Sequence, residues 1–88
     1  MYEVHLAEVV ENSLKKLEQQ IQERIKKRLK RLAEIPIPND AKFITRDESN
    51  EKIFRYSIGD YRALYKVKEK EHIVLIIKVD KRPRVYER

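Results

Sequence analysis

The chain has no cysteine and no tryptophan, and it has only one glycine, three prolines and two histidines in 88 residues. The absence of cysteine excludes disulfides and thiolate metal sites. His5 and His72 would need carboxylate help to hold zinc, so we expect no metal or cofactor. Scarce glycine and proline favour a chain rich in regular secondary structure over a disordered one.

Long hydrophobic runs are also lacking. No apolar stretch approaches the ~18 residues that a membrane-spanning helix requires. The first ten residues include Glu3 and Glu8 and do not resemble a signal peptide. We therefore expect a cytoplasmic protein with no membrane partner. Its length predicts a single domain over residues 1–88.

Positive charge is in excess, with 21 Lys and Arg against 15 Asp and Glu and a net charge of +6. A small basic domain favours a polyanionic partner, which could be nucleic acid, an acidic protein or a membrane surface. The alternative is a charge that serves only solubility.

The first half of the chain has a helical pattern after a short strand over residues 2–6. Apolar residues then recur at steps of three and four, at Val9, Val10, Leu14, Leu17, Ile21, Ile25, Leu29 and Leu32. One continuous helix would be about 40 Å long, which is more than so small a domain can easily cover. We predict two antiparallel helices that break near residues 18–20. The alternative is one long helix in a coiled-coil dimer.

The second half changes to the alternating pattern of strands. Pro36 and Pro38 should end the helical region, and residues 37–50 are predicted to form a polar connector anchored by Phe43 and Ile44. Strands are expected at 53–58, 61–67 and 72–79, with turns at 59–60 and 68–71, and the apolar last strand should lie inside the sheet with both faces covered near its middle. The predicted class is α+β with a mainly antiparallel sheet.

The hairpin at residues 53–67 separates two kinds of side chain. A two-residue loop at Gly59 and Asp60 places Ser57 opposite Arg62 and Arg55 opposite Leu64. One face is then apolar and aromatic, with Phe54, Tyr56, Ile58, Tyr61, Ala63, Tyr65 and Val67. The other face carries Arg55, Ser57, Arg62 and Lys66 around Leu64. With Arg82 and Arg84 of the tail, these groups could bind phosphates. The alternative is an ordinary solvated sheet face.

The run FRYSIGDYRALY at 54–65 and the tail KRPRVY at 81–86 are similar to conserved blocks of RelE/ParE-superfamily toxins. The resemblance covers essentially the whole chain and implies a RelE-like fold. For the RelE branch it implies cleavage of messenger RNA on the ribosome without metal, by attack of a ribose 2′-hydroxyl on the adjacent phosphate. The resemblance is more specific for the superfamily than for the branch.

Roles for individual residues follow from this resemblance. Arg55 resembles a residue that contacts the phosphate, and Arg62 resembles the arginine that stabilises the transition state. Arg82 resembles the arginine near the leaving group, and Tyr86 the tyrosine that stacks on a base. The departure is Ser57, which stands where RelE has a lysine that acts as base, and serine is a poor base. Lys66, Lys52 and Lys42 are the alternatives.

The resemblance also implies partners. These are a cognate antitoxin protein, the ribosome and mRNA, and a heterotetramer of two toxins and two antitoxins is common in the family. Two alternative functions remain open. One is inhibition of DNA gyrase, as in ParE, and the other is RNA binding by a degenerate, non-catalytic member.

Overall fold

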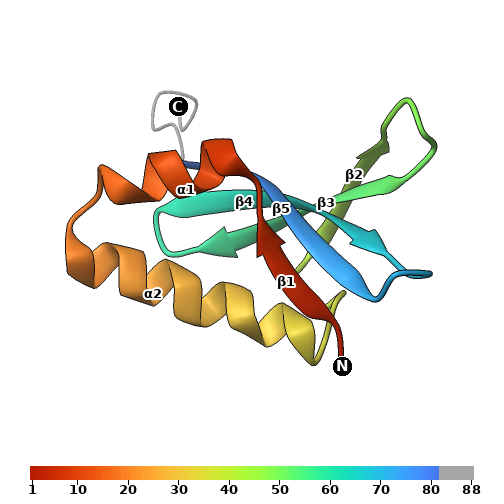
Figure 1. Ribbon diagram of the computed structural model, residues 1–88, viewed down its shortest axis with the longest axis horizontal. Helices are drawn as coiled ribbons and strands as arrows, with labels where there is room; N and C mark the ends of the chain where they lie inside the picture. Colours follow the sequence, from red (N-terminus) through yellow and green to blue (C-terminus); the bar gives the residue numbers. More distant parts are fainter. Residues whose placement is uncertain (82–88) are drawn as a thin grey trace.

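The computed structural model describes residues 1–81, which form a five-stranded sheet and two helices (Figure 1). The elements in chain order are β1 (Glu3–Leu6), α1 (Glu8–Lys15), α2 (Gln19–Lys30), a 3-10 turn (Arg31–Ala33), β2 (Lys42–Arg46), β3 (Lys52–Ile58), β4 (Tyr61–Lys68) and β5 (Ile73–Lys81). The strand order is β1-β5-β4-β3-β2, and only the β1–β5 pair is parallel within this part of the chain. The predicted α+β class is confirmed.

Two antiparallel helices replace the single long one that the pattern also allowed (Figure 1). The break falls at residues 16–18, slightly before the predicted position. The apolar stripe is buried against the sheet at Val10, Leu14, Ile25 and Leu29. Val9 is an exception, because its side chain is 60% exposed. Adjacent residues point about 100° apart on a helix, so Val10 alone takes the buried position. No helix within residues 1–81 is long and apolar enough to cross a membrane.

Strand β2 contradicts the predicted polar connector. Residues 42–46 pair with β3 along the edge of the sheet. Phe43 and Ile44, expected as buried anchors, are 54% and 43% exposed. The strand owes its conformation to backbone pairing with β3. Its five residues are all exposed, so they show no alternation of buried and exposed positions from which a strand could be predicted.

The β3–β4 hairpin has the predicted register. Ile58 pairs with Tyr61, Ser57 with Arg62, and Arg55 with Leu64. Gly59 adopts φ 59°, the left-handed conformation that a tight hairpin turn requires. Residues of the predicted apolar face are buried beneath the helices, with Phe54, Tyr56, Ile58, Ala63 and Tyr65 in the core. The opposite face is open.

Strand β5 lies inside the sheet, between β1 and β4, as predicted. It begins at Ile73 because His72, with φ 58°, belongs to the turn before it. Val74 and Ile76 are fully buried on the helix side. Leu75 remains partly exposed on the other side, so the expectation that both faces are covered is wrong for the open face.

Two β-bulges interrupt the ladder. In β5, Lys78 pairs with Leu64 but Ile76 pairs with Tyr65, so Ile77 is an extra residue without a partner on β4. In β2, Ile44 is an extra residue of the same kind between positions that pair regularly with β3. Because side chains alternate along a strand, each bulge reverses the face to which the following residues point.

Candidate nucleic-acid interface

A hollow of about 250 Å³ lies on the open face of the sheet. Its lining comes from four neighbouring strands: Ile44 of β2, Arg55 of β3, Arg62 and Leu64 of β4, and Lys78 and Asp80 of β5. Both strands that carry a bulge contribute to it. The hollow therefore combines a small apolar floor with three cationic side chains and one carboxylate.

Arg55 and Arg62 provide most of the positive charge of this hollow. Each points away from the helices because its neighbours along the strand belong to the buried face. Neither guanidinium has an ion-pair partner within residues 1–81, and both side chains are partly exposed. An arginine that lacks a carboxylate partner can offer its paired N–H donors to the oxygens of a phosphate.

Ser57 lies beside this site and not within it. It is exposed and pairs with Arg62 across the ladder, but it does not line the hollow. A serine hydroxyl at this place can donate a hydrogen bond to a phosphate oxygen. It offers no proton acceptor of useful strength.

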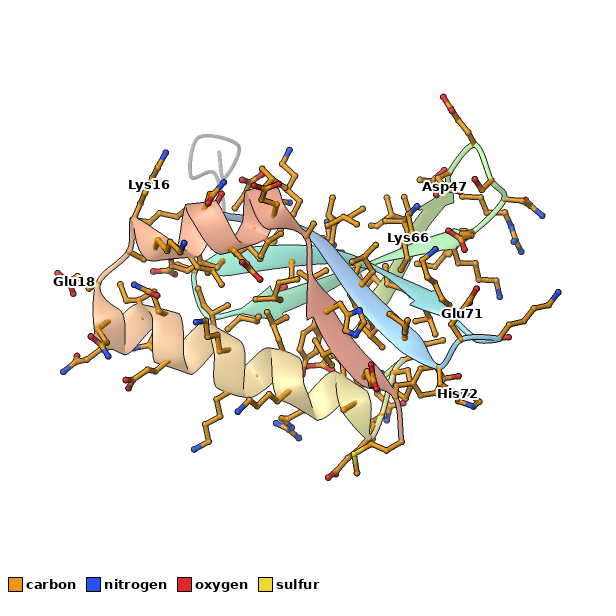
Figure 2. All side chains as sticks on the ribbon, in the orientation of Figure 1. Lys16, Glu18, Asp47, Lys66, Glu71 and His72 are labelled. Atoms are coloured by element: carbon orange, nitrogen blue, oxygen red, sulfur yellow. The ribbon has the colours of Figure 1, made fainter. Side chains whose placement is uncertain are left out.

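Lys66 shares the open face with Arg62 but is engaged elsewhere. Its ammonium pairs with Asp47 and lies 3.4 Å from Glu51, and both acids belong to the connection between β2 and β3 (Figure 2). The hydrogen bond from Lys66 lowers the pKa of Asp47, and the same contact raises the pKa of Lys66. Lys66 does not line the hollow, and its charge is already paired with two carboxylates.

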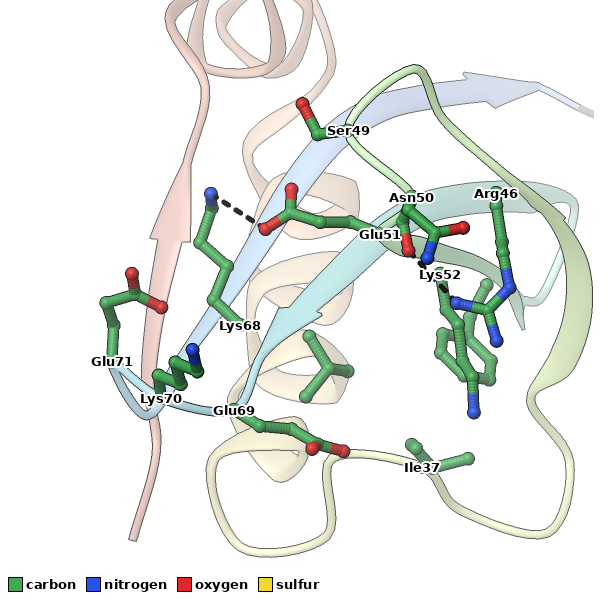
Figure 3. A pocket seen from close by; sticks show the side chains of 12 residues that line it. Ile37, Arg46, Ser49, Asn50, Glu51, Lys52, Lys68, Glu69, Lys70 and Glu71 are labelled. Atoms are coloured by element: carbon green, nitrogen blue, oxygen red, sulfur yellow. Dashed lines mark hydrogen bonds and ion pairs between the residues drawn. The ribbon is translucent and has the colours of Figure 1, made fainter.

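A larger hollow of about 560 Å³ lies beside the turns at 47–51 and 69–72 (Figure 3). Its rim mixes four cations with three carboxylates: Arg46, Lys52, Lys68 and Lys70 with Glu51, Glu69 and Glu71. Lys68 lies 3.4 Å from Glu51, so part of the charge is paired within the rim. Basic and acidic side chains are nearly equal in number on this rim, whereas the hollow at Arg55 and Arg62 has three cations against one carboxylate.

Sequence reasoning missed Lys78 and Asp80. Their side chains lie 3.3 Å apart, Nζ to Oδ2, in the hollow. The signal was present, because Lys78 interrupts the apolar run of the last strand and Asp80 ends it. Their face could not be predicted, since the bulge at Ile77 sets it.

The remaining residues that the sequence suggested for the site do not line this hollow or lie outside the described residues. Lys42 is exposed and pairs with Arg55 across the ladder, whereas Lys52 lines the larger hollow. Arg82, Arg84 and Tyr86 lie outside the described residues. No group of three or more His, Asp or Glu side chains within residues 1–81 could hold a metal ion.

Comparisons with known proteins bear on the whole fold. Residues 4–86 match the family model of the ParE toxin of the type II toxin-antitoxin system parDE. The structure is similar to archaeal RelE in its complex with RelB from Pyrococcus horikoshii, with a TM-score of 0.81, 26% identity, and coverage of 94% of this chain and 97% of that chain. It is also similar to the RelBE2 toxin-antitoxin complex of Mycobacterium tuberculosis, with a TM-score of 0.77, 27% identity, and coverage of 92% of this chain and 98% of that chain.

The isolated RelE toxin of E. coli is also similar, with a TM-score of 0.72, 25% identity, and coverage of 96% of this chain and 87% of that chain. The comparison with curated protein sequences found no match. The family match extends over nearly the entire chain, from β1 past the end of β5. The chain therefore belongs to the ParE toxin family of type II toxin-antitoxin systems, within the RelE/ParE superfamily, and has a RelE-like α+β fold.

Proposed function

We propose that the protein is a ribosome-dependent endoribonuclease that inhibits translation by cleaving mRNA. The observation that carries the proposal is the pair of arginines, Arg55 and Arg62, in one hollow on the open face. The likeness to RelE toxins at 25–27% identity supports it. The 2′-hydroxyl of one nucleotide attacks the adjacent phosphate, which acquires extra negative charge in the transition state.

In this proposal the two arginines have different roles, one in binding the RNA and one in stabilising the transition state. Arg55 holds a non-bridging phosphate oxygen and sets the position of the RNA. Arg62, which lines the same hollow, stabilises the charge that develops as the 2′-oxygen bonds to phosphorus. Ser57 donates a hydrogen bond to the same phosphate or the next one. Arg82 and Tyr86 of the tail are assigned to the leaving group and to a base, as the resemblance implies, and Arg84 is assigned to the RNA phosphates.

We also propose an antitoxin as the partner that holds the toxin inactive. The similar structure from Pyrococcus horikoshii is a RelE-RelB complex, and that from Mycobacterium tuberculosis is the toxin-antitoxin complex RelBE2. The edge strand β2 supports the proposal, because Phe43 and Ile44 are exposed there and its outer backbone groups have no strand beside them within residues 1–81. Co-expression with the gene product encoded next to it should abolish growth arrest and yield a stable complex on size exclusion.

The test of the ribonuclease uses ribosomes programmed with a defined mRNA. The wild-type protein should cut the mRNA in the A-site codon, and an mRNA with a 2′-deoxynucleotide at the cut position should stay intact. Free RNA without ribosomes should be cut far more slowly. If translated mRNA stays intact while growth still stops, the ribonuclease proposal is wrong.

Gyrase inhibition is the second candidate, and two observations favour it. Ser57 stands at the position where the resemblance implies a lysine base, and the matching family model is that of ParE. A supercoiling assay with purified gyrase decides between the two, because only a ParE-like protein should inhibit it. A protein that binds RNA with a steep salt dependence but neither cuts RNA nor inhibits gyrase would be the degenerate RNA binder.

A further inference from the structure

The one carboxylate among the described residues of the hollow is out of place in a site for anions. Asp80 lies in the lining with Arg55, Arg62 and Lys78. A negative charge there repels phosphate and lowers the affinity for RNA. Asp80 and Lys78 form an ion pair, but their side chains are 52% and 60% exposed. Pairs this exposed contribute little to stability, so a purely structural role leaves the cost of Asp80 unexplained.

The backbone is distorted at the point that presents these two side chains. Val74 and Ile76 point toward the helices, so regular alternation would direct Lys78 and Asp80 there as well. The extra residue Ile77 reverses the alternation and directs both into the hollow. Bulges occur often next to active sites, where they redirect a side chain.

We propose that Asp80 is the general base and Lys78 the general acid of RNA cleavage, an inference that rests on the proposed ribonuclease function. A carboxylate can accept the proton of a hydroxyl, and an ammonium can donate one to a leaving oxygen. The pair supplies the proton acceptor that Ser57 cannot supply. It also lies within the described part of the chain, beside the two arginines that hold the phosphate.

The protons balance over one cleavage cycle. Asp80 takes the proton of the 2′-hydroxyl as the 2′-oxygen bonds to the adjacent phosphorus. The bond from phosphorus to the 5′-oxygen breaks, and this oxygen takes a proton from the Lys78 ammonium. The products are a 2′,3′-cyclic phosphate and a 5′-hydroxyl. The proton on Asp80 then passes to the neutral amine of Lys78 across the 3.3 Å contact, which restores the starting pair.

The ion pair must open when RNA binds. The attacking and leaving oxygens stand on opposite sides of phosphorus, so the base and the acid must lie on either side of the phosphate. Both side chains are more than half exposed and can rotate apart. The incoming phosphate assists, because it attracts Lys78 and repels Asp80. Arg62, opposite Asp80 in the β4–β5 ladder, keeps a cation beside the carboxylate after Lys78 has moved.

The surroundings of Asp80 supply cations from neighbouring strands. The charged groups that face Asp80 are Lys78 on its own strand, Arg62 on β4 and Arg55 on β3, whereas β2 contributes the apolar Ile44. The helices cover the other side of the sheet.

The experiment separates the two roles with two leaving groups. Ribosomes are programmed with an ordinary mRNA or with one that has a bridging sulfur in place of the 5′-oxygen at the cut position. Sulfur leaves without protonation, so the second substrate needs a base but no acid. The variants are Asp80→Asn and Lys78→Ala. Their matched controls are Glu71→Gln and Lys70→Ala, which remove the same charges at the other end of the sheet.

Asp80→Asn should cleave both substrates about 10²- to 10⁴-fold more slowly than wild type, the usual range for loss of a general base. Its affinity for RNA should rise, because a repulsive charge is gone. Lys78→Ala should show a similar loss on the ordinary mRNA and recover to within a few-fold of wild type on the sulfur substrate. Both controls should behave as wild type.

Other results overturn the assignment. If Asp80→Asn cleaves within a few-fold of wild type, Asp80 is not the base. If sulfur does not rescue Lys78→Ala, Lys78 is not the acid. If Lys78→Arg cleaves like wild type at neutral pH, a fixed charge suffices and proton transfer from this position is excluded. A wild-type protein that cuts neither substrate removes the proposed function and this inference together, whereas active wild type with active variants removes the inference alone.

Discussion

Arg62 and Lys66 lie on the same face of β4, yet their surroundings differ. Arg62 lies in a hollow with Arg55, Lys78 and Asp80, where Asp80 pairs with Lys78 and Arg62 has no ion-pair partner within residues 1–81. Lys66 is held by Asp47 and Glu51. Strand alternation determines which face a cation occupies. The loops at each end determine whether its charge remains available to a ligand.

The largest effect should come from Arg62, which has no ion-pair partner within residues 1–81. Arg62→Ala should slow cleavage of ribosome-bound mRNA about 10²- to 10³-fold, because a donor aimed at developing charge is lost. Its free energy of unfolding should change by less than about 0.5 kcal/mol, as is usual for surface positions. Cleavage assays measure the first effect, and urea denaturation measures the change in the free energy of unfolding. A protein that unfolds on this substitution would make Arg62 structural and erase the contrast with Lys66.

Arg55→Ala should have a smaller effect, on affinity more than on rate. Loss of one charge-assisted contact should weaken RNA binding about tenfold. The slope of log K against log salt should fall by about 0.7, the value for one phosphate contact on single-stranded RNA. Binding titrations over a series of salt concentrations give both quantities. Lys70→Ala is the matched control, and an equal change in its slope would show that binding responds only to net charge.

Lys66→Met should lower the stability of the protein and leave its rate of cleavage nearly unchanged. The substitution leaves Asp47 and Glu51 without their shared cation, so the connection between β2 and β3 should loosen. The melting temperature should fall by a few degrees at most, because partly exposed ion pairs contribute little. Cleavage should stay within twofold of wild type. A large loss of cleavage with unchanged melting would move Lys66 into the RNA-binding site.

The smallest effect is the pH dependence of this stabilisation. The pKa of Asp47 lies below its ordinary value of 3.8, so its contribution is present above that pH and is lost as the pH falls through the lowered pKa. The pKa of Lys66 lies above 10.5, so its contribution is present below that pH and is lost as the pH rises through the raised pKa. The difference in stability between wild type and Lys66→Met should thus be constant around neutrality and vanish in strong acid. Thermal melts of both proteins across this range provide the measurement, and a difference that persists in strong acid would contradict it.

Much of the fold could be predicted from local patterns. The steps of three and four that include Leu14, Ile25 and Leu29 identify the helices, and alternation around Gly59 identifies the hairpin and its register. These patterns report which side chains need burial. The open face with Arg55 and Arg62 follows from the same alternation, so the centre of the candidate site was accessible to sequence reasoning.

The remainder depends on partners that are distant in sequence. Strand β2 forms because β3 offers it an edge, and its exposed Phe43 and Ile44 have no burial pattern to reveal it. Lys66 was predicted to bind phosphate because nothing in its own strand indicates that Asp47 lies against it. Asp80 and Lys78 were missed because a residue without a ladder partner lies just before them. Each of these depends on register or loop contacts and not on composition.

Ile77 divides β5 into two segments in which opposite sets of residues, even-numbered and then odd-numbered, face the helices. Before it, even-numbered residues are buried, as at Val74 and Ile76, and after it the odd-numbered Val79 is buried. Deletion of Ile77 would give one uniform phase in which Val79 stays buried and Lys78 and Asp80 stay on the open face, because the pairing with β4 already passes over this residue. Regular pairing of Ile77 with β4 would instead exchange the two faces at the end of the strand, so that two charged side chains would move beneath the helices and a valine would move into solvent. The faces at the end of β5 therefore depend on Ile77 staying outside the ladder and not on the presence of this residue.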